Sequence, residues 1–182
     1  MTTSTPLPGA YRRTVMSLIR YAVVMAFVGL LVGIAFQESA RKLTFAMAGA
    51  GLHLEAIMTL ALVHGHVFVM GVIMPLVLGA ALMMAHQAGG REVGPTGLAW
   101  LVKGYLPFAA ATTLLQMVKG YHVLLAVRHG AVDLAAVDAA FLGGAHAPLR
   151  MGLYGLFHAG MGITLGVFLV ALWRSLRPRG AA

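Results

Sequence analysis

Four stretches of the chain are long and apolar enough to cross a lipid bilayer, and this feature constrains the fold more than any other. They run from Thr14 to Phe36, from Leu54 to Ala85, from Leu98 to Ala126 and from Arg150 to Leu176. A bilayer core of about 30 Å needs about 20 apolar residues per helix. Hydrophobic residues make up 60% of the chain and charged residues 10%, which is far outside the range of soluble domains. We therefore expect one integral membrane domain over residues 1–182.

The four apolar stretches predict an all-α fold, a compact bundle of four membrane helices. A membrane β-barrel would instead show alternating polar and apolar residues over segments of about ten residues. The second stretch is longer than a bilayer requires, and Pro75 offers a site for a kink within it. The longest connection, from Val127 to Leu149, is expected to include a short amphipathic helix around Val132 to Phe141.

The basic residues predict the orientation in the membrane. The side that holds both termini collects Arg12, Arg13, Arg20, Arg91, Lys103, Arg174, Arg177 and Arg179. The opposite side has fewer basic residues and most of the acidic ones, Glu38, Glu55, Asp133 and Asp138. By the positive-inside rule both termini face the cytoplasm, and we expect a multi-pass protein of the bacterial inner membrane. The net charge of +8 does not indicate nucleic-acid binding, because the cations sit at helix ends and form no basic face.

The chain has no cysteine, and this excludes disulfides, thiolate nucleophiles, iron–sulfur clusters and covalently attached c-type haem. Phosphate-binding glycine loops, a zinc-binding His-Glu-x-x-His helix and a serine nucleophile elbow are missing as well. Any haem would therefore be held by axial ligands and packing alone.

The candidate functional residues are histidines inside the apolar stretches. His64 and His66 lie two positions apart, so they project about 200° from each other around a helix and serve two different environments. The second and fourth stretches enter the membrane from the same side. At a rise of 1.5 Å per residue, His158 of the last helix lies at a depth similar to that of His64 and His66. Ionisable side chains at membrane depth are costly and usually functional. We expect a buried histidine layer beneath an outer polar layer that contains Lys119.

This layer predicts a haem b protein. His158 and one of His64 or His66 would be the axial ligands of the iron, and Lys119, with Arg150 as a second candidate, would face the propionates. Small residues near His158, namely Gly152, Gly155, Gly160 and Gly162, would let the flat macrocycle approach. Two filled axial positions would favour electron transfer with a redox partner, and an open position would favour binding of a diatomic gas such as O2 or NO.

Two rival interpretations stay open. The twelve methionines and eight histidines also suit a copper conduit or a proton conduit, although the methionines are scattered over the helix faces. A structural subunit whose histidines bridge helices is the other alternative. The sequence leaves open whether the chain is an enzyme, and an oxidoreductase component is the class that haem would imply.

The segment His64-Gly-His66, followed by Met70-Gly71, resembles the His-x-His helix of haem-copper oxidase catalytic subunits, and more closely the His-Gly-His form in nitric oxide reductases. In those enzymes the two histidines face different haems, and the resemblance implies a similar arc of four helices here. The oxidase core has twelve helices in three such arcs, so we expect a homo-oligomer, a homotrimer of this chain. Oxidases carry three further histidines for copper, and the chain offers no matching His-His pair.

A longer resemblance is carried by five short segments spread over most of the chain. They are Gly29 to Gly33, Arg41-Lys42, His64-x-His66, Lys119-Gly120 and Gly155 to His158. In this pattern the chain is similar to an uncharacterised family of small four-helix bacterial membrane proteins, a domain of unknown function.

Overall fold

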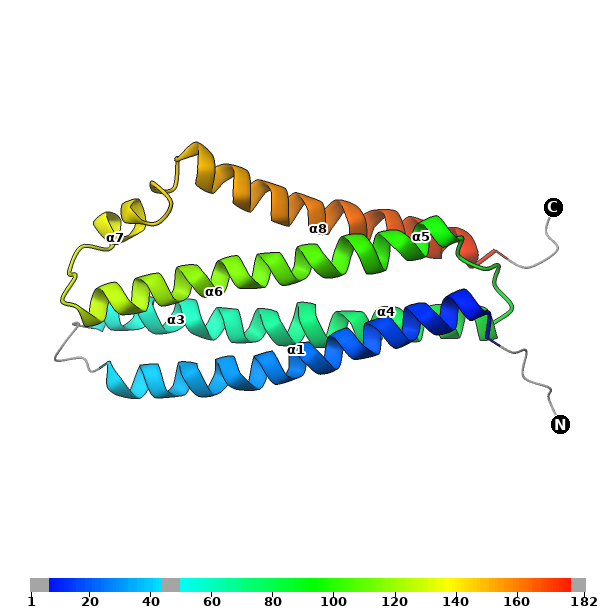
Figure 1. Ribbon diagram of the computed structural model, residues 1–182, viewed down its shortest axis with the longest axis horizontal. Helices are drawn as coiled ribbons and strands as arrows, with labels where there is room; N and C mark the ends of the chain where they lie inside the picture. The colour runs from blue at the N-terminus through cyan, green and yellow to red at the C-terminus, as the bar shows by residue number, and fades with distance from the viewer. Residues whose placement is uncertain (1–6, 44–49, 178–182) are drawn as a thin grey trace.

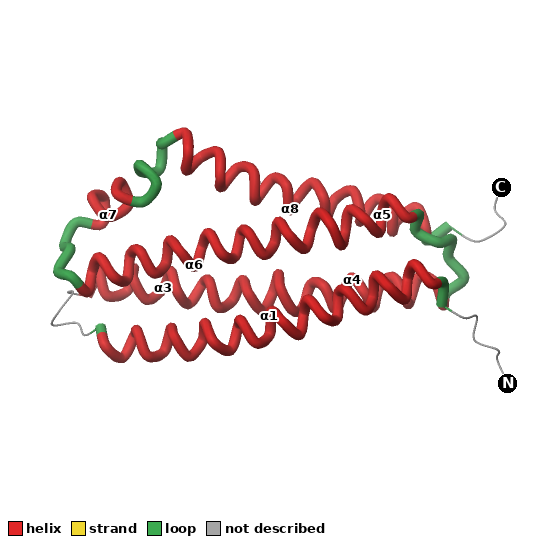
Figure 2. The backbone as a smooth tube through the Cα atoms, in the orientation of Figure 1, coloured by secondary structure: helices red, strands yellow, loops and turns green. Residues whose placement is uncertain are grey.

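The computed structural model describes residues 7–43 and 50–177, and in these residues every regular element is a helix (Figures 1 and 2). Four helical segments are long and apolar enough to cross a membrane: Gly9–Lys42, His53–Gln87, Pro95–Arg128 and Pro148–Ser175. The prediction of an all-α membrane bundle is confirmed. The first three segments extend past the predicted apolar stretches at both ends, because a helix continues through its polar flanks.

The described residues form nine helical elements, of which all but α7 belong to the four segments. The order is α1 (Gly9–Lys42), α3 (Ala50–His66), the π-helix η1 (Val67–Ile73), α4 (Met74–Gln87), α5 (Pro95–Ala99), the π-helix η2 (Trp100–Tyr105), α6 (Leu106–Arg128), α7 (Leu134–Ala140) and α8 (Pro148–Ser175). The short α7 lies within the predicted range Val132 to Phe141. The main contacts join each long segment to the next along the chain. Helix α1 begins and α8 ends at the same end of the bundle, the terminal end, and α7 lies at the other, the α7 end (Figure 1).

Both π-helices end just before a proline. The amide N–H of Met74 donates to the carbonyl of Val69, five residues back, and Pro75 has no N–H to donate. The carbonyl of Met70 therefore loses its usual partner within the helix. The hydroxyl of Tyr105 in η2 donates to it instead, at 3.1 Å. The disruption predicted at Pro75 thus takes the form of a π-helix, whose freed carbonyl links the second segment to the third.

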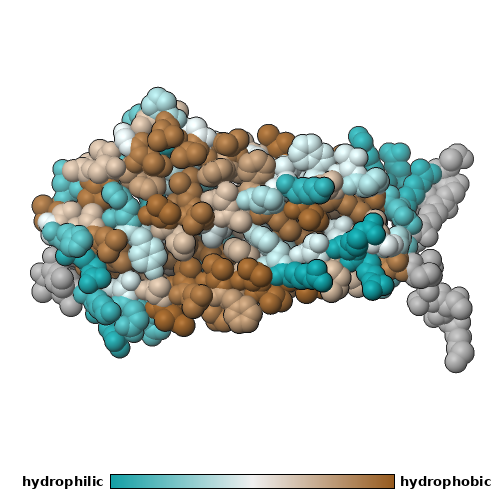
Figure 3. Space-filling view, in the orientation of Figure 1, coloured by the Kyte–Doolittle hydropathy of each residue, from teal (hydrophilic) through white to brown (hydrophobic). Residues whose placement is uncertain are grey.

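The bundle closes around small residues and buried apolar side chains. The largest cluster, at the terminal end, centres on Tyr11, Leu18, Leu82, Tyr105 and Phe168. A Cβ atom on Gly29 or Gly71 would come within 3.0 Å of a side chain on the facing segment, so α1 packs directly against the second span. Apolar side chains dominate the middle of the surface and polar ones gather toward the ends (Figure 3), as expected for a chain surrounded by lipid.

Helix α8 is the most peripheral of the four long helices. It lies close to η2 and the start of α6 near the terminal end and diverges from α6 toward the α7 end (Figure 1). The first turn of α8 is attached to α7 by Arg150, whose guanidinium donates to both carboxylate oxygens of Asp138 at 2.7 and 2.9 Å. The carboxylate of Asp133 caps the start of α7 by accepting from the amides of Ala135 and Ala136.

Candidate functional site

His64 packs against α1 of the same chain. Its Nδ1 lies 3.1 Å from the carbonyl oxygen of Gly29, and its ring meets the edge of Phe68 at a centroid distance of 5.0 Å. A Cβ atom on Gly33 would stand 2.7 Å from the ring Cε1. The imidazole therefore fills the space that Gly33 of α1 leaves open, which gives it a packing role between helices.

His66 points the other way, as the 200° separation predicts. It borders a cavity of about 180 Å³ between α3, α6 and α8. The cavity is also lined by Thr59, Leu62, Val63, Gln116, Lys119 and Tyr154. The Nδ1 of His66 lies 2.8 Å from the carbonyl oxygen of Leu62, one helical turn back. Its side chain is exposed on the protein surface rather than buried.

His158 sits beside the same cavity. Its Nδ1 lies 3.0 Å from the carbonyl oxygen of Tyr154, and its ring stacks on that of Tyr154 at 5.8 Å with an interplanar angle of 13°. Tyr154 also lines the cavity that His66 borders, so this tyrosine connects the ring of His158 to that cavity. The imidazole of His158 is exposed too, so the expected histidine layer is open at the surface.

These contacts place a hydrogen on one nitrogen of each exposed imidazole. A carbonyl oxygen can only accept, so the Nδ1 atoms of His66 and His158 carry the hydrogen and donate it. In this tautomer the lone pair of the ring is on Nε2, the nitrogen farther from the backbone. Histidines that bind metals usually anchor their other ring nitrogen in this manner. Each of the two rings is therefore prepared for ligation through Nε2.

Two polar side chains of the cavity were not anticipated from the sequence. The Oε1 of Gln116 and the hydroxyl of Tyr154 are buried and have no hydrogen-bond partner within the described residues. A buried polar atom without a partner costs about 1 to 3 kcal/mol and calls for an explanation such as a bound group. The signal in the sequence is Gln116 itself, an amide inside an apolar helix three residues before Lys119.

Lys119 lines the cavity on the side toward α7, and its ammonium lies 3.2 Å from the carboxylate of Asp138. Arg150 binds the same carboxylate, and this contact, followed by the one with Lys119, lowers the pKa of Asp138 to about 2. Two cations share one anion, so the cluster keeps a net positive charge of one. Arg150 is occupied in holding α7, which leaves Lys119 as the cation that faces the cavity.

The glycines near His158 divide into two groups. A Cβ atom would meet nothing within 4 Å at Gly152, Gly155 and Gly162. At Gly160 it would stand 2.6 Å from the ring of Phe108, so the expectation that Gly160 leaves room for a cofactor is wrong. Gly155 and Gly162 lie three residues before and four residues after His158, on the same face of α8. That face is open on both sides of the imidazole.

Within the described residues no group of three or more His, Cys, Asp or Glu side chains is placed to hold a metal ion. The candidate ligands are therefore two imidazoles, His66 on the cavity wall and His158 stacked on Tyr154. Comparison of the chain with protein families, with curated proteins and with solved structures gives no match.

Proposed function

We propose that this protein binds haem b within the membrane through His66 and His158 and transfers electrons. The observation that carries the proposal is the shared anchoring of the two imidazoles. Each donates its Nδ1–H to the carbonyl one turn back on its own helix, and this leaves Nε2 available for iron. Two neutral imidazoles from different helices can serve as the axial ligands of haem b in a helical bundle.

The depths of the two histidines support the pairing. His66 lies four residues before the middle of the segment His53–Gln87, and His158 lies between three and four residues before the middle of Pro148–Ser175. At 1.5 Å per residue both are about 5 to 6 Å from the centre of their spans, displaced toward the α7 end. One macrocycle standing between the two helices could reach both nitrogens.

The cavity accounts for only part of the space that a haem needs. Its volume of about 180 Å³ is smaller than the roughly 300 to 1,000 Å³ of typical ligand sites. We infer that the rest of the ring lies against the open face of α8 at Gly155 and Gly162. Polar groups that face hydrocarbon are costly, and a bound haem would cover both exposed imidazoles.

The polar rim suits the propionates. Lys119 and the hydroxyl of Tyr154 are donors that border the cavity, and the cluster of Lys119, Asp138 and Arg150 carries a net charge of +1. This cluster lies on the α7 side of the histidines, so propionates would point toward the membrane surface. When bound, the group would supply one-electron chemistry between Fe(III) and Fe(II), with electrons from a redox partner.

The decisive experiment is an optical spectrum of the detergent-purified protein, oxidised and dithionite-reduced, after expression with ample haem. Pyridine haemochrome gives the haem content, and a carbon monoxide difference spectrum reports an open axial position. We expect a sharp b-type band that carbon monoxide leaves unchanged. A band that shifts with carbon monoxide would favour gas binding, and a colourless protein would reject haem and turn attention to a copper or proton conduit or a structural subunit.

Three alanine variants assign the ligands. His66→Ala and His158→Ala should each abolish the six-coordinate spectrum. His64→Ala is the matched control, because it lies two residues away on the same helix and packs against α1. A six-coordinate spectrum that is retained in either of the first two variants, or lost in the control alone, would contradict the assignment.

The quaternary arrangement follows as a separate proposal. We propose a homotrimer, in which three arcs of four helices would match the layout of the oxidase core. The argument is the helix count and the packing of each helix mainly on its neighbour in sequence. His64 gives it no support, since its ring is engaged within the chain. Native mass spectrometry that detects only monomers would reject the trimer.

A further inference from the structure

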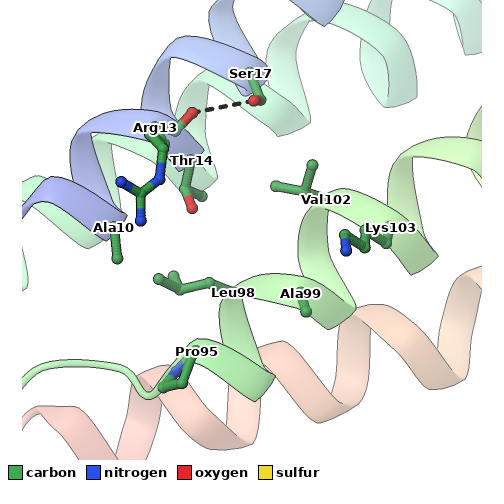
Figure 4. A pocket seen from close by; sticks show the side chains of 9 residues that line it. All are labelled: Ala10, Arg13, Thr14, Ser17, Pro95, Leu98, Ala99, Val102 and Lys103. Atoms are coloured by element: carbon green, nitrogen blue, oxygen red, sulfur yellow. Dashed lines mark hydrogen bonds between the residues drawn. The ribbon is translucent and has the colours of Figure 1, made fainter.

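A groove at the terminal end separates the first turns of α1 from the segment formed by α5 and η2 (Figure 4). Its volume is about 320 Å³, and it is lined by Ala10, Arg13, Thr14, Ser17, Pro95, Leu98, Ala99, Val102 and Lys103. The two cations come from opposite walls, Arg13 from α1 and Lys103 from η2. The hydroxyls of Thr14 and Ser17 stand on the α1 wall, and that of Ser17 donates to the carbonyl of Arg13 at 3.0 Å.

Within residues 7–43 and 50–177, the cations of this groove have no carboxylate partner. The ion pairs among the described residues join Glu38 to Arg41, and Asp138 to Lys119 and Arg150, all toward the α7 end. In the described residues of the terminal end, Glu92 is the one acidic side chain among the basic residues Arg12, Arg13, Arg20, Arg91, Lys103, Arg174 and Arg177. Arg13 and Lys103 therefore stand on opposite walls of the groove, with no neutralising carboxylate among the described residues.

The groove lies at the depth of lipid phosphates. The segments Gly9–Lys42 and Pro95–Arg128 each have 34 residues, which gives a length of about 50 Å. A hydrocarbon core of about 30 Å leaves roughly 10 Å of helix outside it at each end. Arg13 lies about 6 Å and Lys103 about 12 Å from the starts of their segments. The two cations thus bracket the boundary between headgroups and acyl chains.

A second cavity of about 320 Å³ adjoins the groove on the other side of Ala99 and Lys103. It extends deeper into the membrane between η2 and α8, and its walls include Trp100, Gly104 and Phe108. A cationic groove beside a mostly apolar one matches a molecule that has an anionic head and an acyl tail. A free anion would use only the first of the two.

We propose that this pair of cavities is a binding site for one anionic phospholipid. Its phosphate would lie between Arg13 and Lys103, with the hydroxyl of Thr14 as a further donor, and one acyl chain would follow the second cavity past Trp100. Basic pockets between membrane helices bind anionic headgroups in this manner. The site is separate from the histidine cavity, so its test does not depend on haem.

The test uses the two tryptophans of the chain. In a Trp173→Phe protein, Trp100 is the remaining indole, and phosphatidylglycerol with a brominated acyl chain quenches it on contact. In phosphatidylcholine vesicles, a small fraction of brominated phosphatidylglycerol should quench Trp100 far more than the same fraction of brominated phosphatidylcholine. Arg13→Gln and Lys103→Gln should each weaken this preference about fivefold, as expected for about 1 kcal/mol per cation.

Arg12→Gln is the matched control, because Arg12 is an exposed cation on the same turn that does not line the groove. Ala99→Phe fills the boundary between the cavities without removing a charge, and it should abolish the preference as well. Circular dichroism verifies that each variant is folded. Equal quenching by both lipids, an equal effect of Arg12→Gln, or full competition by inorganic phosphate at lipid-equivalent concentrations would each overturn the proposal.

Discussion

The hydrogen bond from Tyr105 to Met70 should stabilise the bundle because of Pro75. Tyr105 is fully buried, and its hydroxyl donates to the carbonyl that the π-helix η1 leaves without a partner. Tyr105→Phe removes the donor and leaves that carbonyl unsatisfied. A buried unpaired carbonyl costs about 1 to 3 kcal/mol, and interhelical hydrogen bonds in membrane proteins contribute about 0.6 to 1.7 kcal/mol. We expect the free energy of unfolding to fall by about 1 to 1.5 kcal/mol.

A double-mutant cycle isolates this mechanism from general damage to the core. Pro75→Ala restores an amide N–H five residues after Met70, which can donate to the same carbonyl. In that background Tyr105→Phe should cost less than half as much as in the parent. Unfolding is followed by circular dichroism while sodium dodecyl sulfate is titrated into detergent-solubilised protein. An equal cost of Tyr105→Phe in both backgrounds would refute the link between the proline, the π-helix and the tyrosine.

Two further predictions concern α8 and its attachment. Gly162→Leu should reduce the haem content severalfold, because the leucine covers the open face beside His158. Gly152 is equally open but lies about 120° around the helix from His158, so Gly152→Leu should change the haem content little in the haemochrome assay. The lowered pKa of Asp138, about 2 against an ordinary 3.8, means that its bond to Arg150 is retained above pH 4 and lost as the pH falls toward 2. The distance between fluorophores on cysteines introduced into α7 and α8 should then increase at low pH. In the Asp138→Asn variant this distance should be large at every pH.

The long helices could be predicted from the sequence because hydrocarbon thickness sets their length. Apolar runs of more than 20 residues allow little else, and α7 followed from a short amphipathic pattern in a connection. The ends were less predictable, since backbone hydrogen bonds continue into polar flanks such as Arg41 and Lys42. His86 illustrates this, because it follows the predicted stretch Leu54 to Ala85 and lies buried in the last turn of α4.

The π-helices could not be derived from local sequence. Pro75 signals a disturbance of the helix, but a kink, a break or a π-helix would each accommodate the missing N–H. The choice depends on a partner for the freed carbonyl, and Tyr105 is 35 residues away in the chain. The distribution of cations was misleading for a similar reason. Arg150 was a candidate for a propionate, and it became an anchor for α7 once folding brought Asp138 beside it.

His64 and His66 show where sequence reasoning stops and packing decides. Their spacing established that they face different surroundings, but not which of them is available for a ligand. That distinction depends on Gly33 of α1, whose missing side chain leaves room for the ring of His64, and on the carbonyl of Gly29, which lies 3.1 Å from its Nδ1. His66 points to the opposite side, where its imidazole is exposed beside a cavity with its Nδ1 bound to its own backbone. The same two-residue spacing thus produces one histidine that packs between helices and one that is exposed beside a cavity.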